Sequence, residues 1–196
     1  MSTKSITCAL LTALSIASAG CGVAEQGRAP VVLRMESLQA GTGTGSGTPT
    51  VSGYLDSDVR RDNGSIFSDV GQVKLSIVLR DPGAPGLANA PSELNTVTIT
   101  HYRVVYHRTD GRNVQGVDVP FAFDSGATFS VSSAGTTSGF EIVRASAKIE
   151  APLLALAVNR QTLDVIADVT FYGKDMHNND ASVTGSIGIT FANYGG

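Results

Sequence analysis

Apolar and polar residues alternate along several short stretches of this chain, which is the pattern of half-buried β-strands. The clearest run covers residues 73–79, where every second residue is apolar and the residues between them are mostly polar. Similar runs predict strands over 31–36, 51–55, 96–108, 117–123, 126–132, 139–149, 163–172 and 182–191. Turns rich in Gly and Pro separate these runs, so the pattern predicts an all-β domain of about seven to nine strands.

The stretch Thr96–Phe123 is the centre of this prediction. Its two β-rich runs flank Asp110-Gly111, a dipeptide that is among the strongest hairpin signals. Within the first run the apolar positions change phase near Thr100-His101. A β-bulge, or a strand that passes between two sheets, produces such a change. We therefore expect a central strand of the domain here, with one of these two features near Thr100-His101.

Only one segment, Pro152–Leu156, favours a helix, and we expect one or two turns there that plug the core. The apolar positions of the strands predict the rest of the core. The predicted core residues are Val73, Leu75, Ile77, Leu79, Val97, Ile99, Tyr102, Val104, Tyr106, Phe121, Ile142, Leu156, Val165, Val169, Phe171, Ile187 and Ile189.

The composition adds little chemistry to this picture. The chain has 196 residues, no Trp, only 16% charged residues and a formal net charge of −3. It contains no block of basic residues, so nothing favours a nucleic-acid partner. Its length suits one domain with a sizeable core.

The first twenty residues have the pattern of an export signal. Lys4 precedes an apolar run over residues 6–17, which is too short to cross a bilayer comfortably as a helix. The small residues Ser18-Ala19-Gly20 then stand immediately before Cys21. This segment resembles the lipobox of bacterial lipoproteins, although Ser18 stands where that family usually has Leu.

The resemblance implies that residues 1–20 are removed and that Cys21 is acylated and becomes the new N-terminus. Residues 21–30 would then be a tether to the membrane, and residues 31–196 a single domain. Gly22, rather than Asp, follows the cysteine, which within that family favours the outer membrane of a Gram-negative host. Removal of residues 1–20 also removes Cys8, so Cys21 would be the only cysteine of the mature chain and no internal disulfide could form.

The two final strands and their turn resemble those of bacterial immunoglobulin-like domains, whose turn often reads Asp, two residues, Gly-Asn. Asp175 and Asn179 fit this pattern, and Asn178 replaces the Gly. The segments RVVYHRTDG, VDVP and FYGKD also resemble a family of secreted bacterial lipoproteins that carries no assigned activity. These resemblances imply an antiparallel β-sandwich of the immunoglobulin-like or fibronectin-III-like type, with a jelly roll as the alternative.

Residues able to carry chemistry are few and scattered. His101 and His107 are six residues apart, about 20 Å along a strand, which is too far for both to bind one metal ion. Asp56, Asp58 and Asp62, together with Asp175 and Asp180, are weak calcium candidates, but their spacing departs from an EF-hand loop and turn-forming carboxylates are the alternative. Cys21 would be acylated, so no cysteine of the mature chain is available as a nucleophile, and no nucleophile elbow is present. We predict no cofactor.

The sequence therefore predicts a non-catalytic binding or structural module, anchored to the bacterial cell envelope through Cys21. An accessory subunit or an enzyme with a site built from loops is the alternative. In an immunoglobulin-like strand order, the loops opposite the start of the first strand come together. One interpretation is that a protein or glycan partner meets the arginines of those loops, which are Arg60, Arg61, Arg108, Arg112 and Arg160. The alternative is that they are ordinary solvated loop charges.

Overall fold

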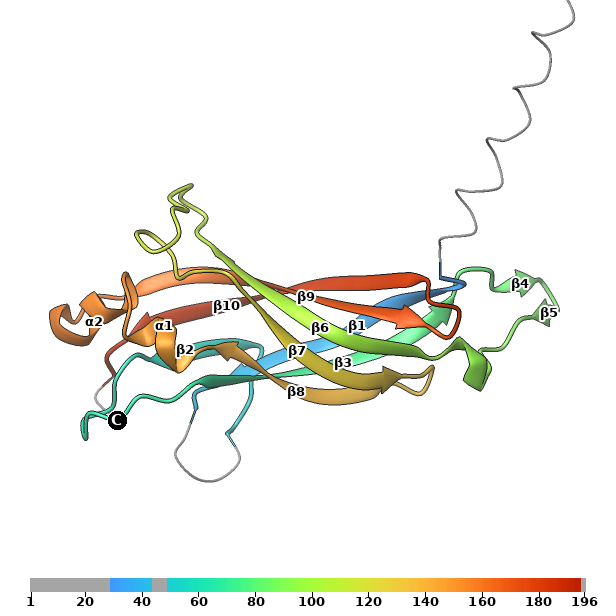
Figure 1. Cartoon of the computed structure of the whole chain (residues 1–196), viewed down its shortest axis with the longest axis horizontal. Helices are drawn as coiled ribbons and strands as arrows, with labels where there is room; N and C mark the ends of the chain where they lie inside the picture. Colours follow the sequence, from blue (N-terminus) through green and yellow to red (C-terminus); the bar gives the residue numbers. More distant parts are fainter. Residues whose placement is uncertain (1–28, 44–48, 195–196) are drawn as a thin grey trace, which may run out of the picture.

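The alternating runs form two β-sheets that face each other (Figure 1). A computed structural model describes residues 29–43 and 49–194 of the chain. One sheet has the order β1-β3-β8, formed by β1 (Val31–Gly41), β3 (Asp69–Leu79) and β8 (Thr136–Val143). The other has the order β2-β10-β9-β6-β7, formed by β2 (Tyr54–Asp58), β10 (Asp180–Ala192), β9 (Leu163–Asp175), β6 (Val97–His107) and β7 (Phe123–Val131).

The remaining elements lie in the connections between these strands. The chain from β3 to β6 contains the short pair β4 (Gly83–Ala84) and β5 (Leu87–Ala88) and a 3-10 turn over Glu93–Asn95. The chain from β8 to β9 contains α1 (Ala145–Lys148) and α2 (Leu153–Asn159). The protein is therefore all-β and sandwich-like, as the alternation predicted.

The core fills the space between the two sheets. Alternate residues of β9 point inward from Leu163 to Phe171 and are buried, because side chains along a strand point to opposite faces in turn. Tyr102, Phe140 and Phe171 form an aromatic cluster, in which Phe140 lies 5.2 Å from both other ring centroids. The predicted core is buried except for Phe121, which is exposed, and Leu79, which is half-buried.

Two tyrosines of β6 join the sheets by hydrogen bonds as well as by packing. The Tyr102 hydroxyl donates to the Glu141 carbonyl (3.0 Å) and accepts from the Glu141 amide (3.1 Å). The Tyr106 hydroxyl donates to the Ile142 carbonyl (2.6 Å). These bonds satisfy backbone groups of β8, and burial raises the pKa of the Tyr106 hydroxyl well above its ordinary value.

Of the two alternatives for the phase change, the structure shows the bulge. The register of β6 shifts between Ile99 and His101 against both of its neighbours, β7 and β9. Ile99 and Tyr102 consequently both point into the core, while His101 lies on the outer face. The phase change in the sequence therefore marks one continuous strand with an inserted residue.

The strand predicted over 117–123 is wrong. These residues belong to the long connection between β6 and β7, and β7 begins only at Phe123 and includes the run predicted over 126–132. A tight turn, in which the amides of Val117, Asp118 and Val119 all approach the Val114 carbonyl, replaces extended backbone. Phe123 is therefore buried (5% exposed) in place of the predicted Phe121 (49% exposed).

Two other predicted boundaries differ from the structure. The strand predicted over 139–149 ends at Val143, and the chain continues into α1, where Ala147 and Lys148 are buried. The strand predicted over 51–55 lies at Tyr54–Asp58, where it pairs in parallel with β10. The predicted strands over 73–79, 163–172 and 182–191 and the helix near Pro152–Leu156 are confirmed.

Candidate functional site

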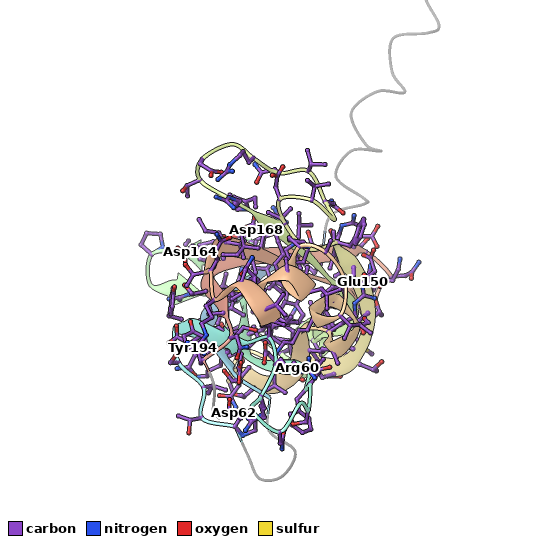
Figure 2. The ribbon with its side chains drawn as sticks, turned by 90° about the vertical axis from the view of Figure 1, so that its left-hand side faces the viewer. Arg60, Asp62, Glu150, Asp164, Asp168 and Tyr194 are labelled. Carbon is purple, nitrogen blue, oxygen red and sulfur yellow. The ribbon has the colours of Figure 1, made fainter. Side chains whose placement is uncertain are left out.

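Three connections meet at one end of the sandwich, which we call the helical end. They are residues 59–68, 108–122 and 144–162, and the last of them contains α1 and α2 (Figure 1). Figure 2 views this end directly. The opposite end, which we call the β1 end, carries the start of β1, the connection over residues 80–96 and the turn between β9 and β10. This is the separation of loops that the predicted strand order implies.

A buried ion pair holds the base of the helical end together. The Lys148 side chain is 1% exposed and that of Asp69 is fully buried, and the ammonium lies 2.9 Å from the carboxylate. Lys148 also donates to the Asp58 carbonyl (2.8 Å). Asp69 accepts further hydrogen bonds from the Ser57 hydroxyl (2.5 Å) and the Gly43 amide (2.9 Å). The pair thus joins α1 to β2 and β3.

Burial raises the pKa of Asp69, and the Lys148 ammonium opposes that rise. Every oxygen of the carboxylate has a partner within the chain, as a buried charge requires. Because both charged groups are closed off from solvent, we assign this pair a structural role.

Helix α2 follows the cis Ala151-Pro152 bond and packs only one side onto the core. Leu153 and Leu156 are buried, as expected for a core plug. Leu154 and Val158 point outward, and Val158 is 83% exposed. Arg160 follows the last helical residue, Asn159. Its φ of 54° lies in the left-handed region that glycine usually occupies at the end of a helix.

The connection over 108–122 is organised by one carboxylate. Asp110 binds two guanidinium groups: Arg108 at 3.1 and 2.6 Å, and Arg112 at 3.0 and 2.8 Å. Hydrogen bonds from these two arginines hold the pKa of the Asp110 carboxyl well below its ordinary value. Further along, Val114 and Val117 are exposed.

A groove of about 220 Å³ lies between this connection and α2. Apolar side chains of Val117, Ala155 and Leu156 line part of it, and Arg108 and Arg112 border it. Apolar surface beside arginine is the composition enriched in the centres of protein interfaces. The groove is therefore our candidate contact site.

All five arginines predicted to meet a partner lie at the helical end, but they do not form one patch. Arg61 is half-buried, donates to the Gly43 carbonyl (2.9 Å) and lies over the Phe67 ring. Arg60 is exposed (Figure 2). Arg160 borders a hollow of about 250 Å³ with Asp62, Asn193 and Tyr194. Arg108 and Arg112 share Asp110, whereas the guanidinium groups of Arg60 and Arg160 form no hydrogen bond with another described residue.

The calcium candidates are spread over both ends of the sandwich. Asp56 accepts the Tyr194 hydroxyl (3.2 Å) on the outer face, and this carboxylate and burial together raise the pKa of Tyr194 to about 12. Asp58 lies beside the Arg60 amide, and Asp62 in the hollow with Arg160. Within residues 29–43 and 49–194, no group of three or more His, Cys, Asp or Glu side chains is arranged to hold a metal ion.

The other two candidates stabilise the turn between β9 and β10. Asp175 accepts the amides of His177 and Asn179 and the side-chain amide of Asn179, each at 2.8 Å. Burial would raise the pKa of Asp175, but the hydrogen bonds from Asn179 and His177 lower it below its ordinary value. Asp180 pairs with Lys174 at 3.0 Å.

The outer face of the five-stranded sheet places a histidine, an aspartate and a serine together. Asp168 accepts the Ser186 hydroxyl (2.6 Å) and lies 3.3 Å from the His107 ring. In a nucleophilic triad the histidine instead bonds to the serine hydroxyl and removes its proton. Here the serine and the histidine both bind the same carboxylate, so the serine–histidine contact of a triad is not formed. Sequence spacing missed this cluster, because it depends on the register of three strands.

His101 lies on the same face and stacks on Tyr172, with ring centroids 4.7 Å apart. The exposed apolar residues of the helical end, Val114, Val117, Leu154 and Val158, were also missed by sequence reasoning. Their residue types are those of a core, and only the tertiary packing leaves them outside.

Cys21, the export signal and most of the tether lie outside the described residues. Over the part of the chain that is described, no helix has the length and apolar character needed to span a bilayer. No protein-family model matches the chain, and searches of curated proteins and of solved structures found no match.

Proposed function

We propose that this chain is a bacterial envelope lipoprotein, anchored through acyl chains on Cys21, whose domain is a non-catalytic binding or structural module. The lipobox-like residues 18–21 support the anchor. Two or more acyl chains bind a membrane stably, whereas one chain binds only marginally. The proposed location is the outer membrane of a Gram-negative envelope.

We further propose that the domain is immunoglobulin-like. In that fold strands A, B and E form one sheet, and G, F, C and C′ the other. The order β1-β3-β8 fits the first set, and β10-β9-β6-β7 fits the second. β2 adds a strand that runs parallel to β10 at the sheet edge.

The observation that carries the proposed binding role is the separation of the two ends. The described chain begins at the β1 end, close to Cys21 in sequence, and the groove lies at the helical end (Figure 1). A tether at the β1 end leaves the helical end free to meet another envelope component. Loops on a rigid scaffold carry most recognition, and exposed apolar groups beside arginines favour a protein partner.

Replacing Cys21 with serine should abolish the anchor. We expect the variant to leave the membrane fraction, or to accumulate as the unprocessed precursor, because serine offers no thiol for acylation. Fractionation followed by mass measurement of the N-terminus checks this result. Cys8→Ser is the matched control, since Cys8 lies in the removed segment, and it should fractionate like the parent. A Cys21→Ser protein that remains processed and membrane-bound would refute the anchor.

Replacing side chains that line the groove should remove the partner. We expect Val117→Ser/Ala155→Ser, and separately Arg112→Ala/Arg160→Gly, to lose at least about tenfold in recovery of a cross-linked envelope partner, which corresponds to about 1.4 kcal/mol. Glycine suits the backbone at residue 160, so the melting temperature should not fall.

The control for this experiment is Val32→Ser/Val78→Ser. These two valines pair across β1 and β3 and are exposed on the outer face of the other sheet. They should keep the partner. If Asp175 or Asp180 variants lose the partner while the variants at the helical end keep it, the contact lies at the β1 end instead.

A further inference from the structure

The β1 end carries an uncharged segment and an uncharged turn. Residues 82–92, which include β4 and β5, read PGAPGLANAPS and contain no charged residue. They project from the β1 end in Figure 1. The turn between β9 and β10, residues 176–179, contains no Asp, Glu, Lys or Arg. The charged residues of the 80–96 connection, which are Arg80, Asp81 and Glu93, lie on either side of the uncharged segment 82–92.

Two large apolar side chains stand exposed at this end, Leu94 in the 3-10 turn that follows segment 82–92 and Met176 in the turn between β9 and β10. Leu94 is 69% exposed and Met176 is 64% exposed. Both are presented by hydrogen-bonded turns. The Asn95 side chain accepts the Ser92 amide (2.8 Å) beside Leu94, and Asp175 accepts two amides of the turn that carries Met176. The turns therefore hold these side chains outward, where they bury little surface within the domain.

The chain before the domain is too short to keep this end away from the anchor. Ala29 is buried, and its carbonyl accepts the Arg80 guanidinium (3.2 Å), while the Pro30 carbonyl accepts the Arg80 amide (2.9 Å). Ala29 and Pro30 are thus held to the domain, next to the start of the 80–96 connection. Eight residues lead from Cys21 to Ala29, and they span at most about 28 Å.

We propose that the β1 end rests on the lipid surface to which Cys21 is anchored, with Leu94 and Met176 in the interfacial layer. This proposal depends on the anchor proposed above. A short tether holds the two surfaces at an effective concentration of about millimolar, so weak contacts suffice to orient the domain. The uncharged segment 82–92 costs little to bring against lipid, since it carries no ionised side chain that must lose water.

The proposed surface is neutral lipid rather than anionic lipid. Binding to anionic headgroups depends on clusters of Lys and Arg. At the β1 end, Lys174 is already paired with Asp180, and Arg80 binds the chain at Ala29. Contact with lipid would orient the sandwich with the β1 end on the membrane surface and the helical end away from it.

The test uses the mature, acylated protein in vesicles of phosphatidylcholine. Because acylation blocks the Cys21 thiol, Leu94→Cys, Met176→Cys and Val158→Cys each introduce one site for an environment-sensitive fluorophore. Nitroxide-labelled lipids should quench the probes at residues 94 and 176 at least about threefold more than the probe at residue 158. Adding Met176→Asp should reduce quenching at residue 94, whereas adding Val114→Asp at the helical end should not.

Equal quenching at residues 94, 176 and 158 in protein that floats with the vesicles would overturn the lipid contact and leave the anchor intact. Protein that does not float would refute the anchor, and the lipid contact with it. All substituted side chains are exposed, so the variants should fold, and circular dichroism checks this directly.

Discussion

Replacing Lys148 with methionine should lower the free energy of unfolding by about 3–5 kcal/mol. Methionine fills a similar volume but removes the cation, so Asp69 is left buried without its charged partner. Chemical denaturation followed by circular dichroism measures the change. The matched control is Lys74→Met, which breaks a solvent-exposed pair with Glu36 and should cost less than about 1 kcal/mol.

The loss should also depend on pH. Burial raises the pKa of Asp69 above its unfolded value, and removal of Lys148 removes the charge that opposes this rise. A raised carboxyl pKa stabilises the fold when the group is protonated, and that stability is lost as pH increases through the folded-state pKa. The Lys148→Met defect should therefore be smaller in acid than at neutral pH. Adding Asp69→Asn should recover part of the stability at neutral pH, because it removes the unpaired charge.

A defect below about 1 kcal/mol in Lys148→Met would contradict the structural role of the pair. Such a result would mean that water or another group reaches Asp69. A defect of the expected size with no pH dependence would assign the loss to packing rather than to charge.

Replacing Gly173 with alanine should lower the free energy of unfolding by about 2–3 kcal/mol, because it overfills a closed part of the sheet. Gly173 lies on β9 opposite the bulge of β6. A Cβ atom there would stand 2.5 Å from the Thr98 carbonyl oxygen and 3.0 Å from the Ile99 Cα. Both are backbone atoms, so no side-chain rotation relieves the clash, and β6 and β9 must separate.

Gly126→Ala is the control for this substitution. Gly126 lies on β7, opposite His101, and a Cβ atom there meets nothing within 4 Å. Alanine at this position should leave stability unchanged or slightly higher, since it restricts the unfolded chain. If both substitutions cost the same, the close approach at the bulge would not explain the requirement for glycine at residue 173.

Local pattern was sufficient for the strands whose two faces differ in polarity. The alternation over 73–79 and 163–172 follows the inward and outward positions of β3 and β9, and the phase change at Thr100-His101 locates the bulge. The helix at α2 was predictable because leucines follow a proline between two strands. In each case a residue's own type and its near neighbours decide its environment.

Tertiary packing decided the rest. Nothing near Lys148 or Asp69 in the sequence shows that they meet, since 79 residues separate them. The segment 117–123 has strand-forming residues, yet β7 pairs with β6 only from Phe123 onward. Val117 and Phe121 therefore remain exposed. The cluster of His107, Asp168 and Ser186 exists only in the observed register. Contacts between distant residues depend on which strands become neighbours, and the local hydrophobic pattern does not encode that choice.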